Sequence, residues 1–156
     1  MVEKTDWQPN FLVYLSETAT FSANLKSRRA MIHWIRLRLN SLGLDETNLR
    51  KAELASEEVL VNIIKHGYKK QTGKIEIELQ MLHSHIEILF RDYGPPFNPL
   101  EREISFNPFA TLEERRPGGL GILFIRQYMD EVRYRREKNA NVLMLIQKFT
   151  DSSRLK

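Results

Sequence analysis

Residues 54–68, Leu-Ala-Ser-Glu-Glu-Val-Leu-Val-Asn-Ile-Ile-Lys-His-Gly-Tyr, constrain the fold more than any other stretch of the chain. The 3.6-residue period of their neighbourhood predicts a helix with one buried stripe, made of Ala52, Ser56, Val59, Leu60, Ile63 and Ile64. Glu58, Asn62 and His66 are spaced by four, so they form a polar row beside that stripe. A carboxylate one turn before a carboxamide can hold a hydrated Mg²⁺ and orient a water or hydroxyl. Taken alone, the row is more typical of a solvated helix face.

The composition indicates one soluble domain. A length of 156 residues suits a single core, and 42% hydrophobic with 28% charged residues is ordinary for a globular protein. No apolar run approaches 18 residues, and the N-terminus lacks the layout of a signal peptide, so no membrane association is expected. The absence of cysteine excludes disulfides and thiolate chemistry, and it fits a cytoplasmic protein.

The net charge of +4 comes from basic residues in two clusters. No recognition helix or zinc module accompanies them, so direct nucleic-acid binding is not expected. An acidic protein partner or a phosphorylated ligand is at least as natural a use for these clusters. They are Arg28, Arg29, Arg36 and Arg38, and then Arg133, Arg135, Arg136 and Lys138.

The order of predicted elements favours an α+β fold. It is a two-layer α/β sandwich with helices on one face of a mixed, mostly antiparallel sheet, rather than a doubly wound parallel sheet. Ser22 is the expected N-cap of the first helix and Asp45 that of the second, and Gly43 ends the first. His83-Ser-His85 is expected as a solvated hairpin tip rather than a metal site. The predicted order is a strand at 10–21, helices at 23–42 and 45–69, strands at 74–82 and 86–91, an irregular stretch at 97–117, a helix from Ile122 to Met129 after the glycines, and strands at 132–136 and 141–149.

Gly118-Gly-Leu-Gly121 opens the last predicted helix. Glycines there let the backbone approach a ligand closely, and the free amides at the helix start favour an anion such as phosphate. Arg115 and Arg116, just upstream, add positive charge where a terminal phosphate could lie. The alternatives are a tight turn for the glycines and ordinary surface solvation for the arginines.

Asp92 ends a buried strand and is followed by Gly94 and two prolines. A carboxylate fixed there can accept a hydrogen bond from an exocyclic amine, and the glycine allows a planar base to lie against the backbone. The alternative is an aspartate that only closes a turn. Together with the polar row and the glycine-rich helix start, Asp92 indicates an ATP site that lacks both a P-loop and a protein-kinase glycine-rich hairpin.

These three boxes resemble those of the histidine kinase-like ATPase superfamily, and within it the stand-alone anti-sigma-factor serine kinases of bacteria. The resemblance covers about residues 10–149. Its carriers are Glu58-Val-Leu-Val-Asn62-Ile-Ile-Lys-His66-Gly-Tyr68, then Asp92-Tyr-Gly94-Pro-Pro-Phe-Asn-Pro99, then Arg116-Pro-Gly-Gly-Leu-Gly121-Ile with Met129-Asp-Glu-Val132. It implies a Bergerat-type ATP-binding fold in a single domain over 1–156, with an ATP lid at about 97–117.

The resemblance also implies a role for each matched position. Glu58 would be the general base that orients the attacking serine hydroxyl, and Asn62 would bind Mg²⁺. Asp92 would accept a hydrogen bond from the adenine amino group, and Gly94 would lie beneath the adenine ring. The remaining matched positions in the nucleotide-binding boxes are His66, expected as an anchor at the helix end, Gly118, Leu120, and Gly119 and Gly121, whose backbone amides would meet the phosphates.

The implied activity is ATP-dependent phosphorylation of a serine, or occasionally a threonine, on a small STAS-domain anti-anti-sigma protein. Catalysis in such kinases is mostly positioning and charge neutralisation. The implied second partner is a sigma factor, silenced by a homodimer of the kinase. Arg115 and Arg116 remain alternatives for the catalytic arginine of the lid. A non-catalytic nucleotide-binding regulator is the alternative function.

Three positions depart from the family pattern. Tyr93 is bulkier than usual beside the expected adenine position, Asn98 stands where the family often has Asp, and Ala140 replaces an expected turn glycine. None of them is the expected base or metal ligand.

Overall fold

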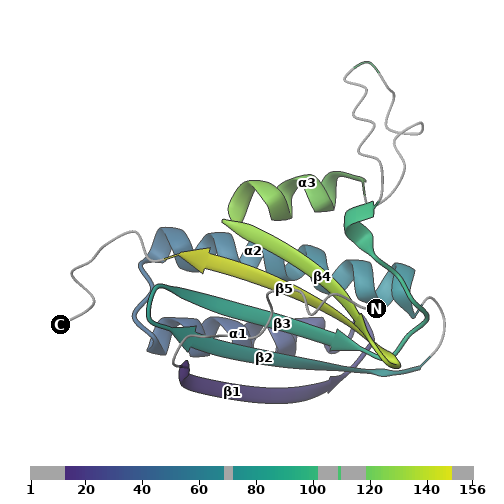
Figure 1. Ribbon diagram of the computed structural model, residues 1–156, viewed down its shortest axis with the longest axis horizontal. Helices are drawn as coiled ribbons and strands as arrows, with labels where there is room; N and C mark the ends of the chain where they lie inside the picture. The colour runs from purple at the N-terminus through teal and green to yellow at the C-terminus, as the bar shows by residue number, and fades with distance from the viewer. Residues whose placement is uncertain (1–12, 69–71, 102–108, 110–118, 149–156) are drawn as a thin grey trace, which may run out of the picture.

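The computed structural model describes residues 13–68, 72–101, 109 and 119–148. These residues form one sheet and three α-helices, with a π-helical turn after the second helix and a short 3-10 turn before the third (Figure 1). The elements are β1 (Val13–Ser22), α1 (Arg28–Ser41), α2 (Glu46–Asn62), η1 (Ile63–Gly67), β2 (Lys74–Leu82), β3 (His85–Asp92), η2 (Pro99–Glu101), α3 (Gly119–Tyr128), β4 (Glu131–Glu137) and β5 (Ala140–Lys148).

The strand order is β1-β2-β3-β5-β4, and each pair of neighbours is antiparallel. The α+β class is therefore confirmed. The sheet is antiparallel throughout the described strands rather than mixed, because the β2–β3 and β4–β5 hairpins meet through β3 and β5, which run in opposite directions. This junction sets Asp92 of β3 opposite Asn141 of β5.

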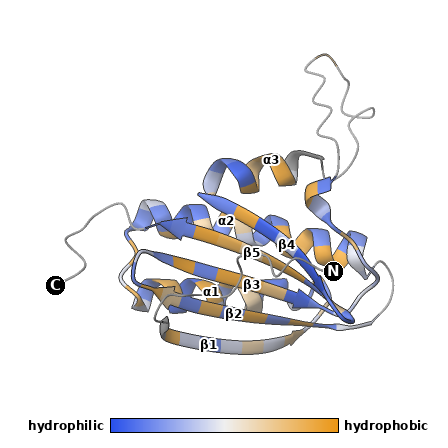
Figure 2. Cartoon of the chain, in the orientation of Figure 1, coloured by the Kyte–Doolittle hydropathy of each residue, from blue (hydrophilic) through white to orange (hydrophobic). Residues whose placement is uncertain are grey.

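The main core lies between the helices and one face of the sheet. Along most of β2 hydropathy alternates from residue to residue (Figure 2), so every second side chain enters the core. In β3, Ile86, Ile88 and Phe90 enter the core, while Leu89 belongs to a second buried cluster. Ile77 and Phe90 from the sheet, Ile35 from α1, Val59 from α2 and Ile125 from α3 are each fully buried there. Among the described helices, none is long and apolar enough to cross a membrane.

The first helix begins later than the sequence indicated. Ser22 is the last residue of β1, paired with Lys74, so it does not cap α1. Instead the side chain of Asn24 accepts a hydrogen bond from Ser27 N–H at 2.8 Å, which shapes a turn before α1. The other two predictions are confirmed: Gly43 follows α1 with a φ of 79°, and Asp45 caps α2 by accepting from Asn48 N–H at 2.9 Å.

The β4–β5 hairpin needs no glycine at Ala140. Ala140 is the first residue of β5 and pairs with Glu137. The left-handed conformation of this turn is taken by Lys138, with a φ of 47°. The turn therefore forms without a glycine at position 140, because Lys138 adopts the left-handed conformation.

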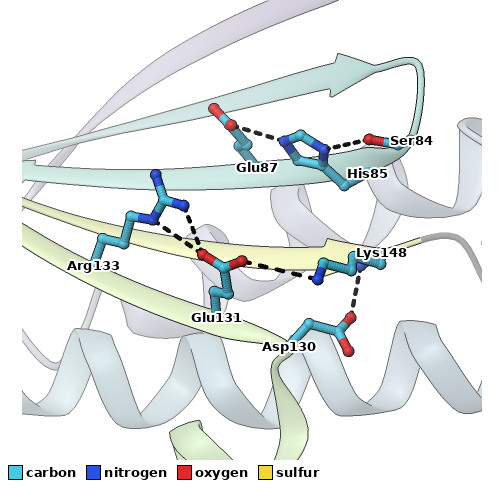
Figure 3. A network of polar contacts seen from close by, with 7 residues as sticks. All are labelled: Ser84, His85, Glu87, Asp130, Glu131, Arg133 and Lys148. Atoms are coloured by element: carbon cyan, nitrogen blue, oxygen red, sulfur yellow. Dashed lines mark hydrogen bonds and ion pairs between the residues drawn. The ribbon is translucent and has the colours of Figure 1, made fainter. Parts of the chain in front are cut away.

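Contacts between Asp130 and the last residues of β5 fix where α3 ends (Figure 3). Asp130, between α3 and β4, donates its N–H to Ile146 O at 3.0 Å, and its Oδ2 accepts from Lys148 N–H at 2.7 Å. Beside it, Glu131 accepts from the Arg133 guanidinium at 2.7 Å. These contacts hold the end of α3 on β5 and so orient the helix whose start carries the expected phosphate amides.

The β2–β3 hairpin tip is only partly solvated. His83 is exposed, whereas His85 is half-buried, with one ring nitrogen 2.9 Å from Ser84 Oγ and the other 2.9 Å from Glu87 Oε1 (Figure 3). The described residues contain no group of three or more side chains suited to a metal ion. The tip histidine thus has a local structural partner.

Ser56 lies in the buried stripe of α2 with no exposed surface, and its Oγ has no hydrogen-bond partner within the part of the chain that the structure describes. We expect Ser56→Ala to raise the free energy of unfolding by about 0.5–1.5 kcal/mol, because it removes an unsatisfied hydroxyl and improves helix propensity. Urea denaturation measures this. The control is Ser41→Ala, whose exposed hydroxyl donates to Arg38 O at 2.7 Å and should shift stability by less than about 0.5 kcal/mol. A destabilised Ser56→Ala variant would contradict the prediction.

Candidate nucleotide-binding site

Glu58 and Asn62 lie on the side of α2 that faces the start of α3. A Cβ added at Gly121 would stand 2.6 Å from Glu58 Oε2 and 3.8 Å from Asn62 Nδ2. The carboxylate therefore lies directly against the α3 backbone, where an added Cβ would displace the end of the Glu58 side chain. The polar row predicted from its four-residue spacing thus meets the glycine-rich helix start in space.

The Glu58 carboxyl is half-buried, and in the described residues it has no hydrogen bond. Burial is the main cause that raises its pKa; the nearby Glu57 carboxylate raises it further, and Arg28 opposes the shift. A raised pKa makes this carboxylate a better proton acceptor than an ordinary surface glutamate. This environment fits the general-base role that the sequence predicts for Glu58.

Asn62 is 5% exposed, and its Nδ2 has no hydrogen-bond partner among the described residues. A buried amide without a partner is costly unless a ligand or water satisfies it. Rotation of the amide by half a turn exchanges the nitrogen and oxygen positions, so the same site can present Oδ1 to a cation. The residue therefore fits a Mg²⁺ that keeps most of its waters and its phosphate ligands.

A π-helical turn, η1, follows Asn62 and brings α2 close to the end of β3. Its closing bond runs from Tyr68 N–H to Ile63 O at 2.9 Å. The Tyr68 hydroxyl donates to Lys74 O and accepts from Tyr93 N–H, both at 2.7 Å. This one side chain therefore ties the end of η1 to the start of β2 and to the residue after Asp92.

Asp92 ends β3 and is 5% exposed. Its Oδ1 accepts from Gly94 N–H at 3.0 Å and from Asn141 Nδ2 at 3.0 Å. Burial raises the pKa of this carboxyl, while the two donors and the charge of Arg136 lower it. A Cβ at Gly94 would stand 3.2 Å from Asp92 Oδ1 and 3.4 Å from Gly67 O, so glycine also allows the two backbone segments to meet.

A pocket opens beside Asp92, between α2 and the β3–β5 junction. Its lining is apolar except for four polar residues. The sequence pointed to Asp92 and Asn62 but missed Asn141 and Tyr134. The full lining is Val59, Asn62, Ile63, Asp92, Phe97, Pro99, Tyr134, Asn141 and Leu143.

The other predicted site residues divide into two groups. His66 is half-buried within η1 and is absent from the pocket lining, in keeping with an anchoring role. Gly119 and Leu120 belong to the first turn of α3. Gly118, Arg115 and Arg116, with most of the expected lid, lie outside the described residues.

Two departures from the expected family pattern do not obstruct the pocket. The Tyr93 hydroxyl donates to Glu76 at 2.9 Å, and Lys74 Nζ lies 5.1 Å from the ring centroid, so the side chain follows β2 rather than entering the pocket. Asn98 Oδ1 accepts from Leu100 N–H at 2.9 Å and stabilises the start of η2. An asparagine therefore performs the turn-forming role open to aspartate at this position.

The chain is similar in sequence to a family of ATPase domains and to proteins named as serine kinases. The family model described as "Histidine kinase-like ATPase domain" matches residues 21–147. The Serine-protein kinase RsbW of Oceanobacillus iheyensis is 27% identical over 109 residues, 67% of this chain and 69% of that protein. The Serine-protein kinase RsbW of Bacillus thuringiensis (strain Al Hakam) is 29% identical over 108 residues, 67% of this chain and 68% of that protein.

A solved structure supports the fold. The crystal structure of the RsbU and RsbW domains of Rv1364c from Mycobacterium tuberculosis aligns with a TM-score of 0.61 at 15% identity. The alignment covers 85% of this chain and 32% of that longer one. At this identity the likeness concerns the arrangement of the sheet and helices.

Proposed function

Because the chain belongs to the histidine kinase-like ATPase domain family, we propose that it is an ATP-dependent serine kinase and anti-sigma factor. Its proposed substrate is a serine or threonine hydroxyl on a STAS-domain anti-anti-sigma protein. Two similar proteins carry the name Serine-protein kinase RsbW, which supports the choice of reaction. A sigma factor is the proposed second partner and a homodimer the proposed assembly; both would operate in the cytoplasm.

One observation carries the proposal: Glu58 Oε2 lies 2.6 Å from the Cβ position of Gly121, at the start of α3. Helix starts bind phosphate through free backbone amides, and a carboxylate at the same place can accept a proton from a hydroxyl that approaches the phosphate. Asp92, buried in the neighbouring pocket, can accept from an adenine amino group. In this proposal, the base, the phosphate contacts and the adenine contact serve one bound nucleotide.

In the proposed reaction, the oxygen of the substrate hydroxyl bonds to the γ-phosphorus of ATP, and Glu58 accepts the proton of that hydroxyl. The bond from that phosphorus to the β–γ bridging oxygen breaks, and ADP leaves with the electron pair. Asn62 would hold Mg²⁺, which neutralises phosphate charge when bound. In the proposal the backbone amides of Gly119 and Gly121 hold the phosphates, and Leu120 and Gly118, the latter outside the described residues, belong to the same sequence motif.

Further features belong to the proposal. We propose that residues 97–117 act as an ATP lid, and that either Arg115 or Arg116, both outside the described residues, binds the terminal phosphate. The whole of 1–156 acts as a single domain. Both statements rest on the family boxes in the sequence and on the match of the family over residues 21–147.

The test is phosphate transfer from γ-labelled ATP, with Mg²⁺, to the cognate STAS-domain protein. We expect label on one serine or threonine of that protein, and loss of transfer when Mg²⁺ is chelated. Nucleotide binding by the wild type without any transfer would contradict the kinase proposal and favour a non-catalytic nucleotide-binding regulator. Transfer to a histidine instead would identify a different reaction class.

A further inference from the structure

Asn141 of β5 has a buried side-chain amide with every hydrogen-bonding position occupied. Its Nδ2 donates to Asp92 Oδ1 at 3.0 Å and to Pro95 O at 2.9 Å. Its Oδ1 accepts from Phe97 N–H at 3.1 Å and from the Tyr134 hydroxyl at 2.5 Å. The residue is 3% exposed. These four contacts fix the direction of the amide, because a flip would set donor against donor and acceptor against acceptor.

The amide determines which Asp92 oxygen is available to a ligand. Oδ1 already accepts from Asn141 and from Gly94 N–H, whereas Oδ2 accepts no hydrogen bond in the described residues. Burial raises the pKa of this carboxyl, whereas both donors favour its ionised form, which can only accept hydrogen bonds. Asp92 is therefore presented to the pocket through one oxygen, as a hydrogen-bond acceptor without a proton to give.

We propose that Asn141 is a positioning residue that makes the Asp92 site selective for a purine with an exocyclic amine, as in adenine, over one with a carbonyl at that place, as in guanine. This inference rests on the proposed ATP site. An acceptor oxygen matches an amine donor and repels a carbonyl oxygen. A site built to bind one such group rejects its opposite because the buried partner is left unpaired.

The same amide also fixes the backbone that leaves β3 toward the α3 side of the site. Its contacts to Pro95 O and Phe97 N–H hold this segment against β5, and Arg136 Nη1 donates to Gly94 O at 2.9 Å. Asn141 therefore connects base recognition to the segment that precedes η2. A substitution of Asn141 should therefore weaken nucleotide binding more than it slows phosphate transfer from nucleotide that is already bound.

The matched pair of variants is Asn141→Ala and Gln147→Ala. Gln147 lies on the same strand and the same face, is 5% exposed, and donates to Asn48 O at 3.1 Å, at the end of β5 away from the pocket. We expect Asn141→Ala to weaken ATP binding about tenfold and to lower the ATP-to-GTP affinity ratio at least about fivefold. Gln147→Ala should lose thermal stability but retain the wild-type ratio.

Asn141→Asp supplies a second readout. It sets two carboxylates at the present 3.0 Å contact, and such a pair cannot easily carry two charges, so it shares one proton at lower pH. That proton replaces the bond from Nδ2. Relative to wild type at each pH, ATP affinity of this variant should fall at least about tenfold from pH 6 to pH 9. The other charged or titratable groups near Asp92 are Arg136 and Tyr134 of β4, and Tyr68 after η1.

Isothermal titration with ATP and GTP, together with circular dichroism of each variant, decides the matter. A reduced ATP-to-GTP ratio in folded Asn141→Ala and the pH-dependent loss in Asn141→Asp support the inference. Wild-type protein that does not prefer ATP over GTP overturns it, as does Asn141→Ala with the wild-type ratio. Wild type that prefers ATP but transfers no phosphate contradicts the kinase proposal alone.

Discussion

Glu58→Gln should reduce the rate of phosphate transfer to the STAS-domain protein about 100- to 10,000-fold, while ATP binding changes little. Gln keeps the length and volume of the side chain beside Gly121 but cannot accept the hydroxyl proton. Single-turnover transfer from γ-labelled ATP measures the effect. In the wild type, the rate should fall with decreasing pH as Glu58 protonates, at a pH above that of an ordinary glutamate, because burial raises its pKa.

Folding of Glu58→Gln provides an internal check. A carboxyl whose pKa is raised on folding favours the folded state when protonated and disfavours it once ionised, so its contribution is lost as pH rises through the folded pKa. At neutral pH, Glu58→Gln should thus be at least as stable as wild type. The control is Glu57→Gln, which removes the adjacent carboxylate and should retain most transfer. Wild-type transfer by Glu58→Gln would remove Glu58 from the mechanism.

Gly121→Ala tests the same geometry without changing the carboxylate. Its Cβ would meet Glu58 Oε2 at 2.6 Å, so the side chain must move from the start of α3. We expect a loss of transfer comparable with that of Glu58→Gln. Gly67→Ala is the matched control, because nothing lies within 4 Å of its Cβ position.

The sequence predicted those parts of the site that depend on local spacing. Glu58 and Asn62 share a helix face because they are four residues apart, and Asp45 caps that helix through its own turn. The prediction that Ser22 caps α1 was wrong, because Ser22 pairs with Lys74 and is the last residue of β1. A distant strand therefore overrode a local capping preference.

Asn141 could not be assigned from spacing, since its partner Asp92 is 49 residues away and the contact depends on the β3–β5 junction. One signal was present in the sequence. Asn141 and Gln147 are the two polar residues that precede Lys148 in an otherwise apolar strand, and their even spacing puts them on one face of it. A polar side chain that enters a core needs a hydrogen-bond partner. Asn141 donates to Asp92, and Gln147 donates to Asn48.

Asp92→Asn should weaken ATP binding at least about 30-fold, or roughly 2 kcal/mol. Oδ1 of the new side chain can still accept from Gly94 N–H and Asn141, which leaves the new Nδ2 where Oδ2 faces the pocket. That position would then donate toward the adenine amino group, which is also a donor. By the same reasoning GTP should lose less affinity than ATP, or should gain. Titration of both nucleotides measures the two effects.

The control for Asp92→Asn is Asp130→Asn, at the other end of the sheet (Figure 3), where a carboxylate also accepts a backbone N–H, from Lys148 at 2.7 Å. Its nucleotide affinity should equal that of wild type. Since burial raises the pKa of Asp92, ionised Asp92 disfavours folding, so Asp92→Asn should not lose stability through its missing charge. In the wild type, ATP affinity should fall with decreasing pH as Asp92 protonates, earlier than for an exposed aspartate. Undiminished ATP binding by Asp92→Asn would exclude Asp92 as the adenine contact, because this change preserves the shape of the side chain and replaces one acceptor atom by a donor.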